Sequence, residues 1–452
     1  MAMGANGQPR RSSLFSALVL ILFGTLFLLH NYRGGVNFAE LIHHWWPVLL
    51  ILWGVSKLYE RTMGRREGAK APTVTAGEIF LVLGMLTLVG VFALAEILPG
   101  KIQGTEPLWG SEFTYDAAVA PRAVSPTARI AVRIPRGNIT VHTADTPELK
   151  VAAQKRVRAW SEARAESIAN GVRIEIAPDG DDFEVRTSGT DTRAASVSVD
   201  LEITVPRKAA LTIRDERGDV EVNDAGSELA ISTRYGDVTV LNAGAGVSVE
   251  LGHGDVRVSG VKGNVKISGK GGEVEVSEAT GGLTLDGEFY GPIRAEKVAK
   301  GVRFISSRTD LTLTQLNGRM EASSGNLDIS KSSGDLTLRT KSYVVSLEDV
   351  TGRMNIENRG GDVSARFTTP PMEEIEITNK SASISLTLPR ASTFELSAEC
   401  RSGDIDSEFE APTLKKTTGE SGGARLEGKV GTRGPRITLK TSYGSIGLHK
   451  GS

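Results

Sequence analysis

Two apolar residues separated by one other residue return about every nine positions between Gly218 and Ala365, usually just after a glycine-containing turn. Alternation with period two is the pattern of a strand with one buried face. Strand pairs this short cannot bury a core alone and must stack on their neighbours. The spacing therefore predicts an all-β domain, a β-solenoid or a closely related repeat sheet, with about nine residues per strand and turn. The pairs are Val220/Val222, Leu229/Ile231, Val238/Val240, Val247/Val249, Val256/Val258, Val265/Ile267, Val274/Val276 and Leu283/Leu285, then, after a looser patch, Leu311/Leu313, Met320/Ala322, Leu327/Ile329, Leu336/Leu338, Val345/Leu347, Met354/Ile356 and Val363/Ala365.

The turns refine this period. Four of them place an acidic residue directly after glycine at intervals of eighteen residues, whereas the turns between them are less acidic. This alternation favours two strands and about eighteen residues per coil over three strands and about twenty-seven. The four carboxylates would then line one edge of the solenoid at the strand spacing of about 4.8 Å. This acidic edge consists of Asp219, Asp237, Asp255 and Glu273.

The acidic edge is the candidate metal site of the sequence. Nonapeptide β-rolls bind calcium through G-G-x-G-x-D turns. Here the aspartate follows glycine directly and no second acidic ligand stands at the right offset, so we expect structural turns and no cofactor. A glycosidase needs two carboxylates in unlike environments, about 5–9.5 Å apart across a cleft. Similar carboxylates repeated along an edge do not fit that need, and no H-E-x-x-H motif occurs, so no catalytic residue is predicted.

Composition limits the remaining possibilities. The chain of 452 residues has a formal net charge of −1, which gives no reason to expect nucleic acid as a partner. Aromatic residues make up 6%, which suits a thin solenoid core. The single cysteine, Cys400, excludes an intrachain disulfide framework. It is in phase with Phe394, Leu396 and Ala398, so we expect it to be buried.

Three apolar runs precede the repeat and predict a small helical membrane domain over residues 13–98, after a cytoplasmic tail of residues 1–12. The helices are expected at about residues 14–29, 41–58 and 79–98. A cleavable signal peptide is the alternative for the first run, but no small-x-small site follows it. The second run is short for the ~20 residues of a spanning helix, and a re-entrant segment is its alternative.

Positive charges set the expected orientation. Arg10 and Arg11 precede the first run, and five Lys and Arg residues lie between the second and the third, whereas the first loop contains only Arg33. By the positive-inside rule the N-terminus and the second loop are cytoplasmic. Three crossings then place the repeat domain outside the cytoplasm, with the lipid bilayer as one partner.

The second run carries a resemblance. Trp46-Pro47, six apolar or aromatic residues ending at Trp53, and Gly54 make residues 13–60 similar to the membrane region of LiaF-type cell-envelope stress proteins. The resemblance implies a multi-pass protein of the bacterial plasma (inner) membrane, linked with envelope stress sensing or signalling. The membrane motif is Trp46, Pro47, Trp53 and Gly54.

Beyond the membrane region, residues 99–126 contain scattered Pro, Gly and Ala and are interpreted as a linker. Residues 127–452 form the predicted repeat domain, with one short helix at about 159–170. The segments 201–222, 382–409 and 437–448, together with the repeats, resemble the bacterial "putative adhesin" β-strand-repeat family of unknown function. The resemblance implies a solenoid-like all-β domain at the cell envelope and supplies no catalytic residues. In the looser patch, residues 287–309, an added residue predicts a bulge or protruding turn, with a ligand platform as the alternative.

These observations favour a membrane-anchored, non-enzymatic envelope protein whose repeat domain is a sensing, regulatory or protein-interaction surface in the cell-envelope stress response. The alternative is an adhesin-like or scaffold module that binds extracellular polymer, and an enzyme on a β-helix ranks third. The expected partner is a membrane-bound envelope-stress sensor or a cell-wall polymer.

Overall fold

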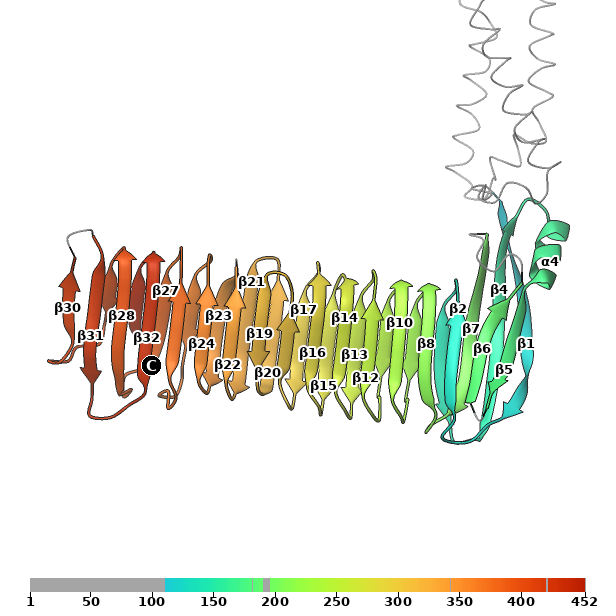
Figure 1. The fold of residues 1–452 in the computed structure, drawn as a ribbon, viewed down its shortest axis with the longest axis horizontal. Coiled ribbons are helices and arrows are strands. Elements are labelled where there is room, and N and C mark those ends of the chain that lie inside the picture. Colours follow the sequence, from blue (N-terminus) through green and yellow to red (C-terminus); the bar gives the residue numbers. More distant parts are fainter. Residues whose placement is uncertain (1–109, 181, 190–195, 342, 420–421, 452) are drawn as a thin grey trace, which may run out of the picture. The chain divides into compact units, whose positions relative to one another are not determined.

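The computed structural model describes residues 110–180, 182–189, 196–341, 343–419 and 422–451. The three expected membrane helices and the membrane motif lie outside these residues. Within the described ranges, no helix is long and apolar enough to cross a bilayer. The chain divides into two compact units, Met1–Phe113 with Arg158–Ala165, and Thr114–Val157 with Glu166–Ser452. The second unit holds the repeat, and its strands stand side by side in a long row (Figure 1).

Each regular coil of the repeat has two strands, one in each of two sheets. Val238 lies opposite Val220 and Val256 in one sheet, and Val247 lies opposite Leu229 and Val265 in the other. These partners are eighteen residues apart and the strands are parallel, as the spacing of the turns predicts. Consecutive apolar pairs in the sequence therefore belong to alternate sheets.

The strands pair in two linear orders. Sheet A runs β1 (Ser111–Ala123), β4 (Glu148–Ala159), β7 (Val197–Pro206), β3 (Ile139–Ala144), β9 (Val220–Asn223), β11 (Val238–Leu241), β13 (Val256–Val261), β15 (Val274–Ala279), β17 (Ile293–Val298), β20 (Leu316–Ser323), β21 (Asn326–Ser333), β23 (Val344–Thr351), β25 (Val363–Arg366), β27 (Ile384–Pro389), β33 (Ile446–Gly451) and β29 (Ile405–Ser407). Sheet B runs β5 (Arg173–Asp179), β6 (Asp182–Ser188), β2 (Arg129–Ile134), β8 (Ala210–Arg217), β10 (Leu229–Tyr235), β12 (Val247–Leu251), β14 (Val265–Gly271), β16 (Leu283–Phe289), β18 (Val302–Ile305), β19 (Thr309–Leu313), β22 (Leu336–Thr340), β24 (Met354–Asn358), β26 (Ile375–Asn379), β32 (Arg436–Tyr443), β28 (Phe394–Ser402), β31 (Ala424–Val430) and β30 (Lys415–Thr418).

The core lies between the two sheets and consists of the apolar pairs. Val238 and Val240 have no exposed surface, whereas Thr239 between them is partly exposed. The same alternation holds in β12, β14 and β24. Because each coil buries only a few apolar side chains, the core is continuous only when neighbouring coils stack. Cys400 is buried in this core, as its phase predicts.

The looser patch keeps the stack but lengthens one coil. Val274 lies opposite Ile293, nineteen residues later, because one residue is added in the turn that contains Tyr290. The Tyr290 side chain is 79% exposed, so the extra length forms a protruding turn. The apolar pairs Ile293/Ala295 and Val302/Phe304 continue the core through the patch.

A change of direction follows the patch. β19 pairs antiparallel with β18 and β22 in sheet B, and β20 pairs antiparallel with β17 and β21 in sheet A. We call β19 and β20 the reversed coil. The pairs Leu311/Leu313 and Met320/Ala322, which the sequence places in the same series as the others, thus belong to a coil that runs the opposite way.

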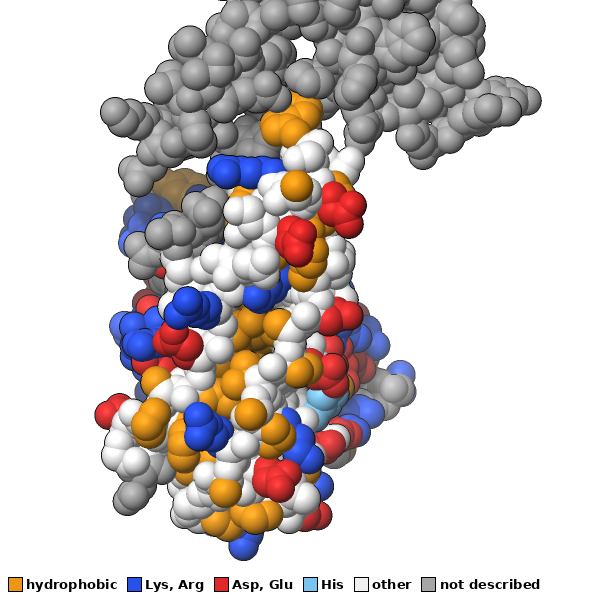
Figure 2. Space-filling model, turned by 90° about the vertical axis from the view of Figure 1, so that its right-hand side faces the viewer, with side chains coloured by type: hydrophobic (Ala, Val, Ile, Leu, Met, Phe, Trp, Pro, Cys, Tyr) orange, Lys and Arg blue, Asp and Glu red, His pale blue; other side chains and the backbone are white. Residues whose placement is uncertain are grey.

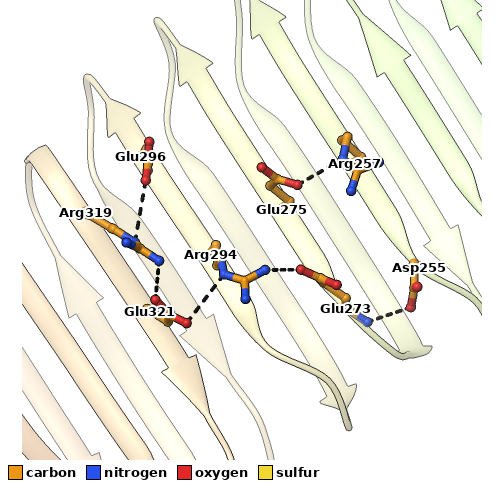
Figure 3. Close-up of polar contacts among 8 residues, drawn as sticks. All are labelled: Asp255, Arg257, Glu273, Glu275, Arg294, Glu296, Arg319 and Glu321. Atoms are coloured by element: carbon orange, nitrogen blue, oxygen red, sulfur yellow. Dashed lines mark hydrogen bonds and ion pairs between the residues drawn. The ribbon is translucent and has the colours of Figure 1, made fainter.

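On the outer face of sheet A, oppositely charged side chains face each other across the antiparallel strands β17 and β20 (Figure 3). Arg294 lies opposite Glu321, with 3.4 Å between Nε and Oε1, and Glu296 lies opposite Arg319, with 3.5 Å between Oε1 and Nε. A parallel pairing of these R-x-E segments would set arginine against arginine and glutamate against glutamate, which is destabilising. The residue pattern therefore favours the antiparallel arrangement.

Both ends of the repeat have the same unusual connectivity. The first coil, β2 and β3, lies between the coil β6/β7 and the coil β8/β9. The last coil, β32 and β33, lies between β26/β27 and β28/β29. We call these two coils the interposed coils. Antiparallel strands extend the sheets beyond them, β4 and β5 at one end and β31 and β30 at the other. Figure 2 looks at the N-terminal end, where apolar side chains show between flanks of interspersed acidic and basic side chains.

Two expected segments have other bounds in the structure. Part of the expected linker, residues 99–126, is the strand β1, whose side chains alternate between exposed and partly buried over its first ten residues. Its Pro and Ala content masks this period-two pattern, so the linker interpretation was wrong for Ser111–Ala123. The helix expected at about 159–170 is α4, which spans Glu162–Gly171.

Candidate functional site

The acidic edge forms a ladder of side-chain to backbone hydrogen bonds. The Asp219 Oδ1 atom accepts from the Asp237 amide (2.9 Å), Asp237 Oδ1 from the Asp255 amide (2.8 Å), and Asp255 Oδ1 from the Glu273 amide (2.7 Å). Figure 3 shows the last of these contacts. Asn138 continues the ladder, because its Oδ1 accepts from the Asp219 amide (3.1 Å). Each side chain of the ladder thus binds the backbone of the next coil.

Glycine precedes these acidic residues because the backbones approach closely there. Gly236 has a φ of 144°, and a Cβ atom at this position would lie 1.9 Å from the carbonyl oxygen of Gly218. Gly218 and Gly254 have the same kind of contact with the preceding coil. The Gly-Asp pair is therefore turn chemistry, in which glycine permits the approach and aspartate binds the amide.

The structure does not gather the acidic edge into a cage of ligands. Within the described residues, no group of three or more His, Cys, Asp or Glu side chains could hold a metal ion. The Glu273 carboxylate also pairs with Arg294. Structural turns at Asp219, Asp237, Asp255 and Glu273 stay the prediction, and calcium binding there stays the alternative.

A groove of about 820 Å³ lies along the C-terminal ends of β2, β6, β8, β10 and β12 in sheet B, where it is lined by both outward and inward side chains. Four arginines are its most numerous lining side chains, and we call it the arginine groove. Three of them, Arg186, Arg133 and Arg214, are neighbours across β6, β2 and β8. The lining residues are Arg133, Ile134, Pro135, Glu184, Arg186, Thr187, Ser188, Gly189, Arg214, Asp215, Glu216, Ser232, Thr233, Arg234, Glu250, Leu251 and Gly252.

The most unusual residue of the groove is Asp215. Its side chain is 5% exposed, and neither carboxylate oxygen has a hydrogen-bond partner among the residues that the structure describes. Burial raises its pKa to about 7, and the nearby amides of Arg217 and Glu216 oppose this rise without reaching hydrogen-bond geometry. Thr233, its neighbour in β10, is 3% exposed, and its hydroxyl also has no partner in the described part of the chain. Buried polar groups normally form hydrogen bonds, so two neighbouring side chains without them make this part of the groove a candidate binding site.

The arginines of the groove are not equally engaged. Arg186 is 3.4 Å from Glu175, and Arg133 is 3.9 Å from Glu184. No ion pair or hydrogen bond engages the guanidinium groups of Arg214 and Arg234 in the described parts of the chain. These two guanidinium groups can therefore bind a ligand without breaking a contact.

A stack of flat side chains borders the groove. The Tyr235 ring is stacked on His253, with 5.0 Å between centroids and 12° between planes. The Arg217 guanidinium carbon lies 5.4 Å from the Tyr235 centroid. Arg217, Tyr235 and His253 come from successive coils, so the coil spacing produces the stack.

Sequence reasoning missed this site. Asp215 stands in the charged run from Arg214 to Asp219, where the apolar pairs give no signal. Its phase does give one, because Leu211, Ile213 and Asp215 alternate on the inward side. Extending the period-two pattern beyond each apolar pair would have placed a carboxylate inside.

The fold and its sites can be compared with known proteins. The model of the family Toastrack DUF4097 matches residues 127–298 and 263–449, which is more than half of the chain. The chain belongs to this family. A second family model, the LiaI-LiaF-like transmembrane region, matches residues 14–58 and includes the predicted membrane motif. The two resemblances found in the sequence are thereby confirmed, and the Toastrack chain is membrane-associated through the second region.

Solved structures similar to this Toastrack protein are described as adhesins. One is a "putative cell adhesion protein" from Clostridium sporogenes ATCC 15579, 9% identical, which covers 75% of this chain and 100% of its own length, with a TM-score of 0.15. Another is a "putative adhesin" from Bacteroides fragilis NCTC 9343, 12% identical, which covers 75% of this chain and 97% of its own, with a TM-score of 0.21. No curated protein matches the chain.

Proposed function

We propose that this Toastrack protein is a non-enzymatic protein of the bacterial plasma membrane whose repeat domain, outside the cytoplasm, is an interaction surface in envelope stress sensing or regulation. The single observation that carries the proposal is the joining of a LiaI-LiaF-like membrane region, residues 14–58, to a Toastrack repeat domain. A membrane region fixes the domain near the bilayer, where it meets envelope components. The distribution of Lys and Arg supports a cytoplasmic N-terminus.

The outer faces of the repeat support an interaction role. Along each sheet, outward side chains stand in rows at the strand spacing of about 4.8 Å. Many of them are charged residues of both signs, such as Arg257 paired with Glu275 at 2.9 Å. Such a surface favours contact with polar partners over burial in a lipid phase. The proposed partner is a membrane-bound stress sensor.

Deletion of the gene in its own host tests this role. A regulator should change the output of an envelope-stress promoter under cell-wall stress, and full-length protein should restore that output. A variant that keeps residues 1–109 but lacks the repeat domain should fail to restore it. Unchanged promoter output on deletion would contradict the proposed regulation.

The topology is testable with protease added to spheroplasts. The repeat domain should be digested while a membrane-embedded fragment survives. Ser402→Cys in a Cys400→Ala background gives an independent probe, because Ser402 is exposed whereas Cys400 is buried. Labelling or digestion only after lysis would reverse the orientation.

An adhesin-like or scaffold module is the second candidate function. The arginine groove favours it, since an open polar groove over several coils suits an extended polymer better than a small compact ligand. Loss of polymer binding on deletion, with normal stress output, would favour this second function. Cleavage of a bound polymer that stops in Asp215→Asn would contradict the non-enzymatic part of the proposal.

A further inference from the structure

We propose that the arginine groove binds an uncharged polyhydroxylated chain, an oligosaccharide, with its hydroxyl groups on Asp215, Thr233, Arg214 and Arg234. This inference does not depend on the stress-related role, because a regulator and an adhesin could each use such a site.

Asp215 determines what the ligand must offer. Its two carboxylate oxygens are buried acceptors, and no donor among the described residues meets hydrogen-bond geometry with them, although the Glu216 and Arg217 amides lie near. A ligand that completes this site must therefore bring hydrogen-bond donors. Ionised carboxylates bring none, and inorganic phosphate brings at most two hydroxyl groups together with negative charge that a buried carboxylate repels, whereas a sugar chain brings many uncharged hydroxyl donors.

Thr233 and the free arginines complete the pattern. The Thr233 hydroxyl, beside Asp215 in the register, can both donate and accept and has no partner. Arg214 and Arg234 supply donors only, on the strands β8 and β10. A sugar hydroxyl can accept from a guanidinium and donate to a carboxylate at the same time. Donors and acceptors at neighbouring positions thus match a ligand whose groups do both.

The charge of the lining argues against a polyanion. The positive charges of Arg133, Arg186, Arg214 and Arg234 face the carboxylates of Glu184, Glu216 and Glu250 in the same groove. A strongly basic site, as nucleic acid or polyphosphate requires, would lack these carboxylates. The nearly balanced charge fits an uncharged ligand.

The scarcity of apolar anchors argues against a peptide. Tightly bound protein partners usually insert aromatic or aliphatic side chains into desolvated pockets. The aliphatic side chains of Ile134 and Leu251 line the groove but are 1% and 2% exposed. Little apolar surface remains to receive such an anchor.

The test uses full-length protein in lipid nanodiscs on a printed array of neutral oligosaccharides of four to eight sugars, including β-1,4-linked glucose and N-acetylglucosamine. We expect binding to at least one of them. Arg214→Ala, Arg234→Ala and Asp215→Ala should each weaken it by about tenfold or more, because each removes a charged hydrogen-bonding group. Arg366→Ala is the matched control, since Arg366 is an exposed arginine on sheet A, and it should leave binding unchanged.

Melting temperature separates binding from folding. Arg214→Ala and Arg234→Ala should not change the melting temperature, because neither guanidinium has a partner to lose among the described residues. Asp215→Ala should not lower it, since the change removes an unpaired buried charge. Absence of binding to every oligosaccharide, or binding that the three groove variants leave unchanged, would overturn the proposal. Binding of only inorganic phosphate or spermine at the groove would also overturn it.

Discussion

Two regions of sheet B place a polar residue at the same inward position, five residues before the first buried residue of the next strand. In the C-terminal region this position holds Asn358 and Asn379, and in the N-terminal region it holds Asp215 and Thr233. All four are buried. The two asparagines lie opposite each other in β24 and β26, as Asp215 and Thr233 do in β8 and β10. Position, burial and strand pairing are thus the same in the two regions, and the difference lies in the chemical groups of the side chains.

The asparagines hold the turns of their coils. The Asn358 Nδ2 atom donates to the carbonyls of Tyr343 (2.8 Å) and Gly361 (2.9 Å), and Asn379 Nδ2 donates to Gly361 (2.9 Å). Within the described ranges their Oδ1 atoms have no partner, so these side chains form hydrogen bonds only through their Nδ2 donors. An ionised aspartate at this position has only acceptors and cannot donate to carbonyls. The side chains at this inward position therefore hold the turns in the C-terminal region, whereas in the N-terminal region they form no hydrogen bond with the described residues.

The largest effect is expected where a carboxylate enters the middle of an apolar pair. Val238→Asp should unfold the repeat domain or loosen it severely, because an unpaired charge among stacked apolar strands costs several kcal/mol. Thr239→Asp, one residue along and partly exposed, should be mild. Thermal unfolding measures both. Equal effects would mean that inward and outward phases are misassigned.

Asn358→Asp converts the C-terminal chemistry into the N-terminal one. The variant loses two hydrogen bonds to carbonyls and buries a carboxylate, so we expect a loss of about 3–5 kcal/mol of unfolding free energy at pH 8. Asn355→Asp, three residues earlier and partly exposed, is the control. Denaturant unfolding of the two variants measures their loss of unfolding free energy. A small loss for Asn358→Asp would show that the amide donors do not hold the turns.

Asp215→Asn performs the opposite conversion and should stabilise the domain. The folded pKa of about 7 lies above the ordinary aspartate pKa of 3.8, so the folded state binds more protons than the unfolded state between these values. Stability from this group is therefore present at low pH and is lost as pH rises towards 7. The variant should be more stable by on the order of 3 kcal/mol at pH 8 and similar to the wild type near pH 4. A constant difference across pH would contradict a titrating Asp215.

The acidic edge should give the smallest effects, because its side chains are mostly exposed. Asp237→Asn keeps the Oδ1 acceptor for the Asp255 amide and should be neutral, whereas Asp237→Ala should cost about 1 kcal/mol. Replacing all four acidic residues with Asn should keep the fold and slightly raise stability at low salt, because like charges are removed. Melting curves with and without calcium test the alternative. A calcium-dependent rise in the wild type that this fourfold variant loses would reveal a cation site.

The spacing and alternation of the apolar residues predict much of the fold, but they do not predict the direction in which a strand runs. The apolar pairs and the eighteen-residue spacing of the Gly-acidic turns predict two-sided coils, which the register confirms. Alternation is identical whichever way a strand runs, so Leu311/Leu313 and Met320/Ala322 gave no sign of the reversed coil. The R-x-E segments at Arg294 and Arg319 do carry that information, through the charges that face each other. Asp215 was missed for another reason: burial of a carboxylate depends on phase, and its charged neighbours suggest an exposed turn.

The interposed coils affect how the domain is made. During synthesis, β26/β27 and β28/β29 emerge before β32 and β33, the strands that must lie between them. Until Arg436–Gly451 arrives, the facing edges of these coils lack their final partners and can pair with any extended strand. The first coil has a related delay, because β2 and β3 gain both neighbours only after β9 is complete. Middle coils can stack as they appear, but the domain closes only when its C-terminal segment has been delivered, so truncated or stalled chains should be the species that aggregate or need a chaperone.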